Sequence, residues 1–136
     1  MDTDMLGASI VGIFITGIIY LIGGIDELMT SLIIIMVIDS ILGVMANYST
    51  QSLSSYKIFK VLMKKTAMVL MVVVAVQLDV VTDSGQFLRS MMTLFLIGME
   101  GVSIVGYLRS IGIAVPQFLI NIFSKLRDTG DKGGKK

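Results

Sequence analysis

Apolar residues come in four long blocks along this chain, and short polar segments separate the blocks. They cover about residues 5–22, 28–47, 66–81 and 87–108. An α-helix rises about 1.5 Å per residue, so about 20 apolar residues cross the roughly 30 Å hydrocarbon core of a bilayer. The pattern therefore predicts an all-α integral membrane protein with four transmembrane helices. A three-span form, in which the first block lies at the interface, is the alternative.

The segment after the fourth block has a different period. In residues 116–127 apolar side chains alternate with polar ones at helical spacing, which predicts an amphipathic helix on the membrane surface or against a neighbour. Its apolar side comprises Leu119, Ile122, Phe123 and Leu126, and its polar side comprises Gln117, Asn121, Lys125 and Arg127. Residues 128–136, DTGDKGGKK, are charged and rich in glycine, which predicts a disordered tail. Residues 1–127 then form a single transmembrane domain.

The composition supports a membrane protein and argues against an enzyme. Hydrophobic residues make up 54% of the 136 residues and charged residues only 15%, which exceeds what a soluble domain of this size can bury. Cysteine and histidine are both absent, so the chain lacks thiolate metal ligands and the usual general base. With no glycine-rich phosphate loop either, we expect no catalytic residues, no metal and no cofactor.

The basic residues are placed asymmetrically. Every Lys and Arg except Arg89 falls either between the second and third blocks or after the fourth block, and with four spans these regions share one side. The positive-inside rule places that side, and with it the C-terminus, in the cytoplasm. We expect these basic residues to face lipid head groups rather than nucleic acid. They include Lys57, Lys60, Lys64, Lys65, Arg109, Lys125 and Arg127.

Polar residues inside the blocks are the candidate functional positions. Asp39 lies near the middle of the second block and shares a helix face with Gly43 and Asn47. A carboxylate at that depth costs roughly 2.5–3.5 kcal/mol on insertion scales, so it needs a partner, water or a pore. Further candidates in the third and fourth blocks are Asp79, Glu100 and Ser103.

Three interpretations of these polar residues are open. They can form a path for a cation or proton, or they can hold helices of an oligomer together. In the third interpretation they face each other in a resting assembly and line a water-filled lesion after rearrangement. In the first block, Ala8, Gly12 and Thr16 form a ridge of small residues that allows another helix to approach closely.

Three stretches in a fixed order resemble a known family. They are MVIDSILGVMAN, LSSYKIFKVLMKKTAMVLMVVVAVQLD and LRSMMTLFLIGMEGVSIVGYLRSIGIAVPQFL. Together they resemble the toxin secretion/phage lysis holins, the holin 4 family, over about residues 25–126. The more specific marks are Asp39-Ser40-x-x-Gly43, the run from Ser54-Ser55 to Lys64-Lys65 into an apolar helix that ends at Leu78-Asp79, Glu100-Gly101-x-Ser103 and Gly112-x-x-x-Pro116.

The resemblance implies a small phage or prophage-like protein of the bacterial cytoplasmic membrane. Such a holin associates with lipids and with further copies of itself, and then forms lesions. The lesions release or activate a cell-wall hydrolase so that the host cell lyses, or they export a toxin, without direct binding to that cargo. The alternatives are a small cation or proton channel that uses Asp39 and Glu100, and a membrane subunit of a secretion or transport complex.

Overall fold

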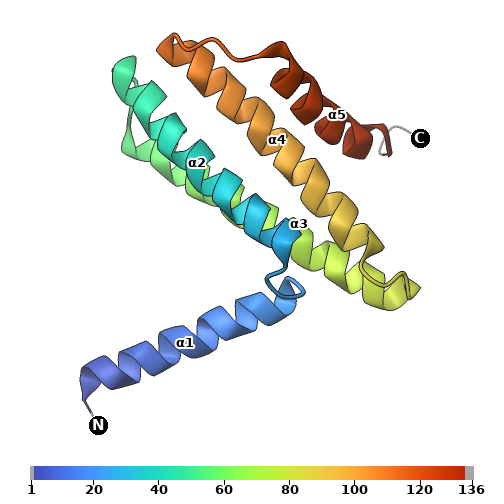
Figure 1. Ribbon diagram of the computed structural model, residues 1–136. Helices are drawn as coiled ribbons and strands as arrows, with labels where there is room; N and C mark the ends of the chain where they lie inside the picture. Colours follow the sequence, from blue (N-terminus) through green and yellow to red (C-terminus); the bar gives the residue numbers. More distant parts are fainter. Residues whose placement is uncertain (1, 134–136) are drawn as a thin grey trace.

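The computed structural model describes residues 2–133, which fold into five α-helices joined by short turns (Figure 1). The helices are α1 (Thr3–Leu21), α2 (Glu27–Ser49), α3 (Ser55–Thr82), α4 (Phe87–Ile111) and α5 (Gln117–Gly133). The first four are long and apolar enough to cross a membrane. The predicted all-α fold with four such helices is therefore confirmed.

Helix α3 is the element whose bounds differ most from the predicted span. It begins at Ser55, not near residue 66, because the Ser54 side chain accepts a hydrogen bond from the Lys57 backbone N–H (3.3 Å) and caps the helix. The lysines that the hydropathy pattern assigns to the region between two spans therefore lie on the helix itself. At about 1.5 Å per residue its 28 residues extend about 42 Å, which is longer than the hydrocarbon core.

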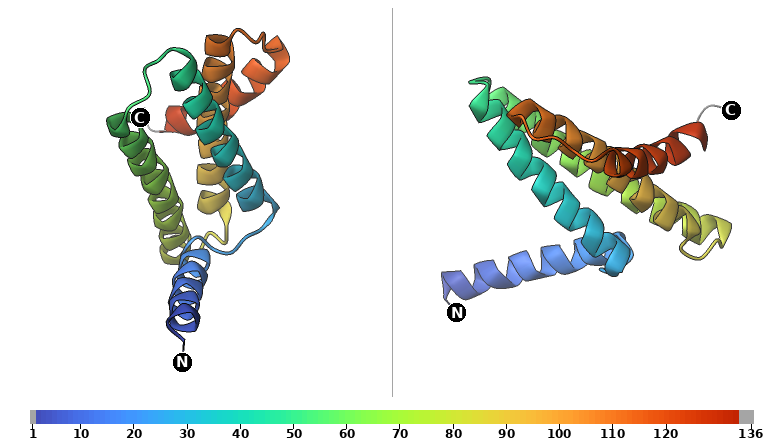
Figure 2. Two further views of the ribbon diagram at one scale, coloured as in Figure 1. Left: turned by 90° about the vertical axis from the view of Figure 1, so that its left-hand side faces the viewer. Right: turned by 45° about the horizontal axis from the view of Figure 1, so that its top comes forward.

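Helix α4 is the centre of the molecule. It packs against α2 and α3 on one side and against α5 on the other (Figures 1 and 2). Apolar side chains from α2, α3 and α4, with Ile22 from the end of α1, form the core. The buried members are Ile22, Met29, Leu32, Met68, Val72, Leu96 and Ile97.

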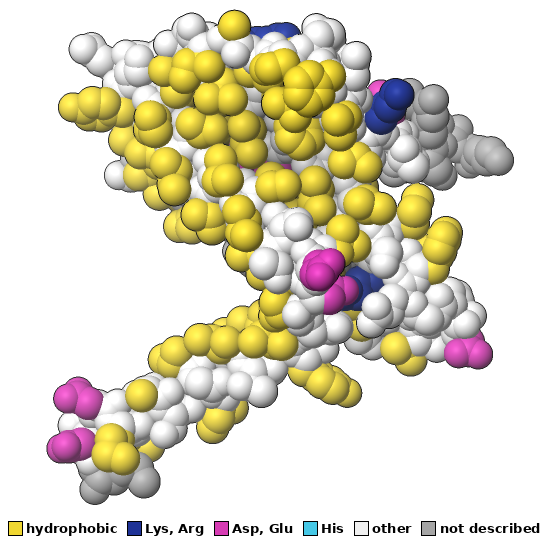
Figure 3. All heavy atoms as spheres, viewed as in Figure 1, with side chains coloured by type: hydrophobic (Ala, Val, Ile, Leu, Met, Phe, Trp, Pro, Cys, Tyr) yellow, Lys and Arg dark blue, Asp and Glu magenta, His cyan; other side chains and the backbone are white. Residues whose placement is uncertain are grey.

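Helix α1 leaves this body at the turn formed by Gly23 and Gly24. Both glycines have positive φ angles, 85° and 94°, which other residues rarely adopt. None of the residues of α1 is buried, and the helix extends away from the rest of the chain (Figure 1). Hydrophobic side chains also cover much of the visible outer face of the other helices (Figure 3). This exposed apolar surface is suited to lipid.

Helix α5 turns back along α4 and extends beyond the predicted amphipathic segment. It ends at Gly133, so residues 128–133 are helical where the sequence predicts a disordered tail, and residues 134–136 lie outside the described part of the chain. A Cβ atom on Gly130 would overlap the ring of Phe95, so this end of the helix still lies close to α4. Pro116 directly precedes the helix, where its carbonyl oxygen accepts a hydrogen bond from the Leu119 N–H (3.1 Å).

Candidate functional site: a buried charged cluster between three helices

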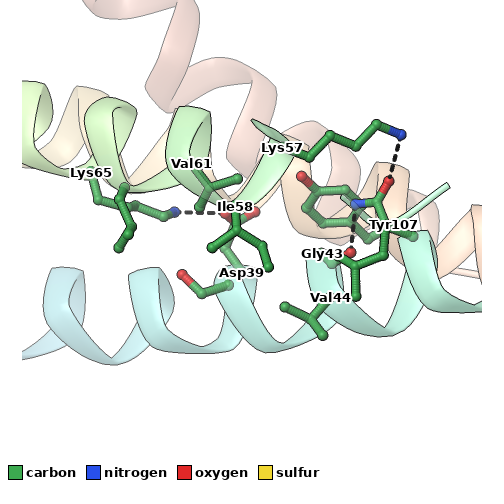
Figure 4. A pocket seen from close by; sticks show the side chains of 12 residues that line it. Asp39, Gly43, Val44, Lys57, Ile58, Val61, Lys65 and Tyr107 are labelled. Carbon is green, nitrogen blue, oxygen red and sulfur yellow. Dashed lines mark hydrogen bonds and ion pairs between the residues drawn. The ribbon is translucent and has the colours of Figure 1, made fainter. Parts of the chain in front are cut away.

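A lysine and two carboxylates meet at the middle of the helical body. The Lys65 ammonium group on α3 donates a hydrogen bond to Asp39 Oδ2 on α2 (2.6 Å) and another to Glu100 Oε2 on α4. Asp39 is 3% exposed and Glu100 is fully buried. Lys65 and Asp39 point toward one another from neighbouring helices (Figure 4). The structure thus brings together two of the predicted intramembrane residues and joins three helices through them.

Lys65 differs from the expectation that it faces lipid head groups. Lys64 and Lys65 are adjacent on a helix, so their side chains are about 100° apart and only one can point toward α2 and α4. Lys65 takes the inner position and its side chain is 14% exposed, while that of Lys64 is 47% exposed. The basic segment therefore supplies the cluster with its cation.

The charges of this cluster are incompletely compensated. Asp39 Oδ1 and Glu100 Oε1 are both buried, and neither has a hydrogen-bond partner among the described residues. The Lys64 Nζ atom lies 4.0 Å from Glu100 Oε1, at the limit of an ion pair. Removing a buried carboxylate oxygen from water without a new hydrogen bond is unfavourable. The cluster consequently holds α2, α3 and α4 together but leaves two buried acceptors unsatisfied by the described part of the chain.

A cavity of about 220 Å³ adjoins the cluster between α2 and α3 (Figure 4). Gly43 lies at its wall, and a Cβ atom there would be 3.2 Å from the Tyr107 ring, so the glycine allows α4 to approach α2 closely. The Asn47 side-chain amide donates to the Gly43 carbonyl oxygen (2.7 Å), and Lys57 Nζ donates to Asn47 Oδ1 (3.3 Å). The predicted helix face of Asp39, Gly43 and Asn47 thus lines this one cavity, together with the polar side chains of Lys57 and Lys65.

A second charged centre lies at the end of the body where α1 joins it. Arg89, at the start of α4, is 1% exposed. Its guanidinium group donates to the carbonyl oxygens of Ile22 (2.6 Å) and Gly24 (2.8 Å) and to Asp26 Oδ2 (2.7 Å). The hydrogen bond from Arg89 lowers the pKa of Asp26, which lies outside the helices and caps α2. Arg89 therefore ties the turn between α1 and α2 to α4.

Asp79 belongs to this second centre and lies apart from the Lys65 cluster. It accepts hydrogen bonds from the backbone N–H groups of Leu88 and Arg89 (both 2.8 Å) and from the Ser84 hydroxyl (2.6 Å). These donors belong to the first turn of α4 and the turn before it, so Asp79 stabilises the start of that helix. Asp79 was predicted as an intramembrane polar residue, and Arg89 was not among the predicted site residues. The signal for Arg89 was its isolation as the single basic residue on its side of the membrane, where Asp26, Glu27, Asp79 and Asp83 also lie.

The remaining predicted positions make fewer contacts. Ser103 is half-buried on α4, three residues after Glu100. Ala8, Gly12 and Thr16 are exposed on α1, and a Cβ atom on Gly12 would meet no atom within 4 Å. The small-residue ridge of α1 is thus uncovered within a single chain. Lys60, Arg109 and Lys125 are exposed, and Arg127 is half-buried beside Asp128 (3.2 Å).

Comparison with known proteins identifies the family of this chain. The sequence profile of the bacteriophage holin family matches residues 16–128, which include both charged centres. The chain belongs to the bacteriophage holin family. The suspected relationship to the holin 4 family is thereby confirmed, and the four apolar helices agree with a membrane protein of this family.

Three curated relatives of this holin-family chain are named only as uncharacterised proteins. The Listeria monocytogenes protein Lmo0128 and the Listeria innocua protein Lin0175 are each 32% identical over 103 residues, which is 76% of this chain and 74% of the relative. The Clostridium perfringens protein CPE0383 is 27% identical over 124 residues, or 90% of each chain. No solved structure matches.

Proposed function

We propose that this protein is a phage holin that oligomerises in the host cytoplasmic membrane and forms lesions. The lesions release or activate a cell-wall hydrolase, or export a toxin. Membership of the bacteriophage holin family supports this proposal. Chemistry at a catalytic site plays no part in it, because the work of such a protein is to remove the membrane barrier.

The observation that carries the proposal is the incomplete compensation of Asp39 and Glu100. Both lie near the middle of apolar helices, and each keeps one buried oxygen without a hydrogen-bond partner among the described residues. Polar groups in hydrocarbon are stabilised by partners or by water. An assembly that hydrates this cluster would therefore be favoured over isolated copies in lipid.

The orientation that we propose follows from the two ends of the helical body. Lys57, Lys60 and Lys64 lie on the first turns of α3, and Arg109 lies on the last turn of α4. Arg89 at the other end is neutralised by Asp26. The positive-inside rule thus favours a multi-pass protein whose C-terminus is in the cytoplasm.

Inducible expression in a bacterium tests the function directly. The protein is produced with or without a cytoplasmic cell-wall hydrolase, and culture density and entry of a membrane-impermeant dye are followed. A holin gives abrupt, delayed lysis that requires the hydrolase and coincides with dye entry. Gradual depolarisation with dye and hydrolase both retained would instead indicate a cation or proton channel. A stable partner on gentle purification, without any lesion, would indicate a subunit of a larger complex.

A further inference from the structure

Helix α5 packs on a face of α4 that is formed by Gly98 and Gly101, which we call the glycine face. A Cβ atom on Gly101 would overlap the Phe123 ring, and one on Gly98 would lie 2.8 Å from the Leu126 Cβ atom. Both glycines are buried beneath α5. The close contact between the two helices therefore depends on the absence of side chains at these two positions.

The depth of this contact conflicts with the polarity of α5. Gly98 lies about 13 residues before the end of α4 at Ile111, so it is roughly 20 Å from that end and close to the middle of a bilayer. Arg127 packs at the level of Gly98, and the side chains of Arg127 and Asp128 are 42% and 49% exposed. Charged groups are strongly disfavoured at that depth in lipid. The docked position of α5 thus requires water along its outer side.

The same helix has a suitable position on the surface of a sealed membrane. Its apolar side chains face one side, and those of Phe118 and Ile122 stay 63% and 49% exposed when α5 is docked on α4. At the membrane surface, all of this apolar side can enter the interface while the charged side stays in water. The segment between α4 and α5 begins at Gly112, whose φ of 95° shows a turn that a glycine adopts easily.

We infer that α5 lies on the cytoplasmic membrane surface while the membrane is sealed, and docks on the glycine face of α4 when a lesion fills with water. Docked α5 then lines the lesion with its polar side. This inference rests on the proposed function, because a lesion is what brings water to the middle of α4. It assigns the C-terminal amphipathic helix a role in stabilising the open state.

Filling the glycine face tests the role of docking. Gly101→Leu places a side chain where the Phe123 ring lies, and overpacking of this kind should lower the docked population about tenfold or more. We expect this variant to accumulate in the membrane like the parent but to release little hydrolase. Gly106→Leu, on the same helix, is the matched control, since a Cβ atom there would meet no described atom within 4 Å. Phe123→Ala combined with Gly101→Leu should restore lysis, and normal lysis by Gly101→Leu alone would overturn the inference.

A cross-link tests the order of events independently of lysis. The chain has no cysteine, so Phe95→Cys with Gly130→Cys introduces the two thiols of interest, at positions whose Cβ atoms would be 2.9 Å apart. Membranes isolated before and after dye entry are oxidised. We expect a low yield before dye entry and a high yield afterwards, and a low yield throughout for Gly106→Cys with Gly130→Cys.

A high yield in sealed membranes would overturn the inference, because α5 would then be docked without a lesion. A parent chain that never admits dye would instead overturn the proposed function. In that case the same cross-link still reports the position of α5, which should stay undocked in the sealed membrane.

Discussion

The two charged centres of this protein are built differently. The Arg89 guanidinium group donates to two carbonyl oxygens and to Asp26, and Asp79 accepts from three donors. The Lys65 cluster places one ammonium group between two carboxylates, and two buried oxygens stay without a hydrogen-bond partner among the described residues. A centre whose charged groups all have hydrogen-bond partners fixes the shape of the chain. A centre with unpaired buried acceptors can lower its free energy when it gains new partners. We therefore assign a structural role to the first centre and a role in assembly to the second.

The largest effect is expected from breaking the Arg89 centre. Arg89→Met removes the donor to Ile22, Gly24 and Asp26 and leaves these acceptors unpaired. Hydrogen bonds from a charged donor contribute about 1.5–3 kcal/mol each to the free energy of unfolding, and this change removes them from three groups. We expect poor accumulation in the membrane and a lower midpoint of thermal unfolding in detergent. Accumulation and unfolding like those of the parent would show that this centre is not structural.

A smaller loss of stability is expected from Lys65→Met. The change removes two hydrogen bonds from a charged donor, one to Asp39 and one to Glu100, which correspond to about 1.5–3 kcal/mol each in the free energy of unfolding. Lys64 limits the loss, because its Nζ atom already lies 4.0 Å from Glu100. Unlike Arg89→Met, this variant should accumulate and lyse at a changed time. Glu100→Gln added to Lys65→Met should bring lysis time back toward that of the parent, and an unchanged lysis time in Lys65→Met would remove the cluster from the mechanism.

The close contact beside the cluster gives a test of packing alone. Gly43→Leu would force apart α2 and α4, because a Cβ atom at this position is 3.2 Å from the Tyr107 ring. Overpacking of this kind costs about 1–3 kcal/mol in the free energy of unfolding, measured by thermal or denaturant unfolding in detergent. Gly12→Leu on α1 is the control, since open space surrounds it in the single chain. Equal effects of the two changes would contradict the structure.

The smallest effect is a pH dependence at the Arg89 centre. The hydrogen bond from Arg89 holds the pKa of Asp26 below its ordinary value of 3.8. The stabilisation by Asp26 is thus fully present above pH 3.8 and is lost as the pH falls through the lower pKa of the folded state. The Asp26 side chain is 47% exposed, so solvent screening keeps the effect small. The difference in unfolding midpoint between parent and Asp26→Asn should shrink as the pH is lowered from neutral to this acidic range, and a constant difference would contradict this assignment.

The sequence was sufficient for the elements and for part of the site. Apolar blocks predict four long helices because length and hydropathy are local properties. A carboxylate in the middle of such a helix, such as Asp39, is identified as a candidate site because its free energy in lipid is unfavourable without a partner. The choice between Lys64 and Lys65 could not be made in this way, since it depends on which side of α3 faces α2 and α4. Arg89 was not among the predicted site residues for a similar reason. Its acceptors at Ile22 and Gly24 are far away in the chain and are backbone atoms, which the side-chain sequence does not reveal.

The isolation of α1 has a consequence for how substitutions are tolerated along the chain. The family profile begins at residue 16, within α1, and α1 itself contains no buried residue. Variation in α1 is therefore constrained by hydrophobicity more than by shape, whereas α4, enclosed between α2, α3 and α5, is constrained residue by residue. Systematic mutagenesis should then divide the protein at Gly23 into a permissive arm and a restrictive body.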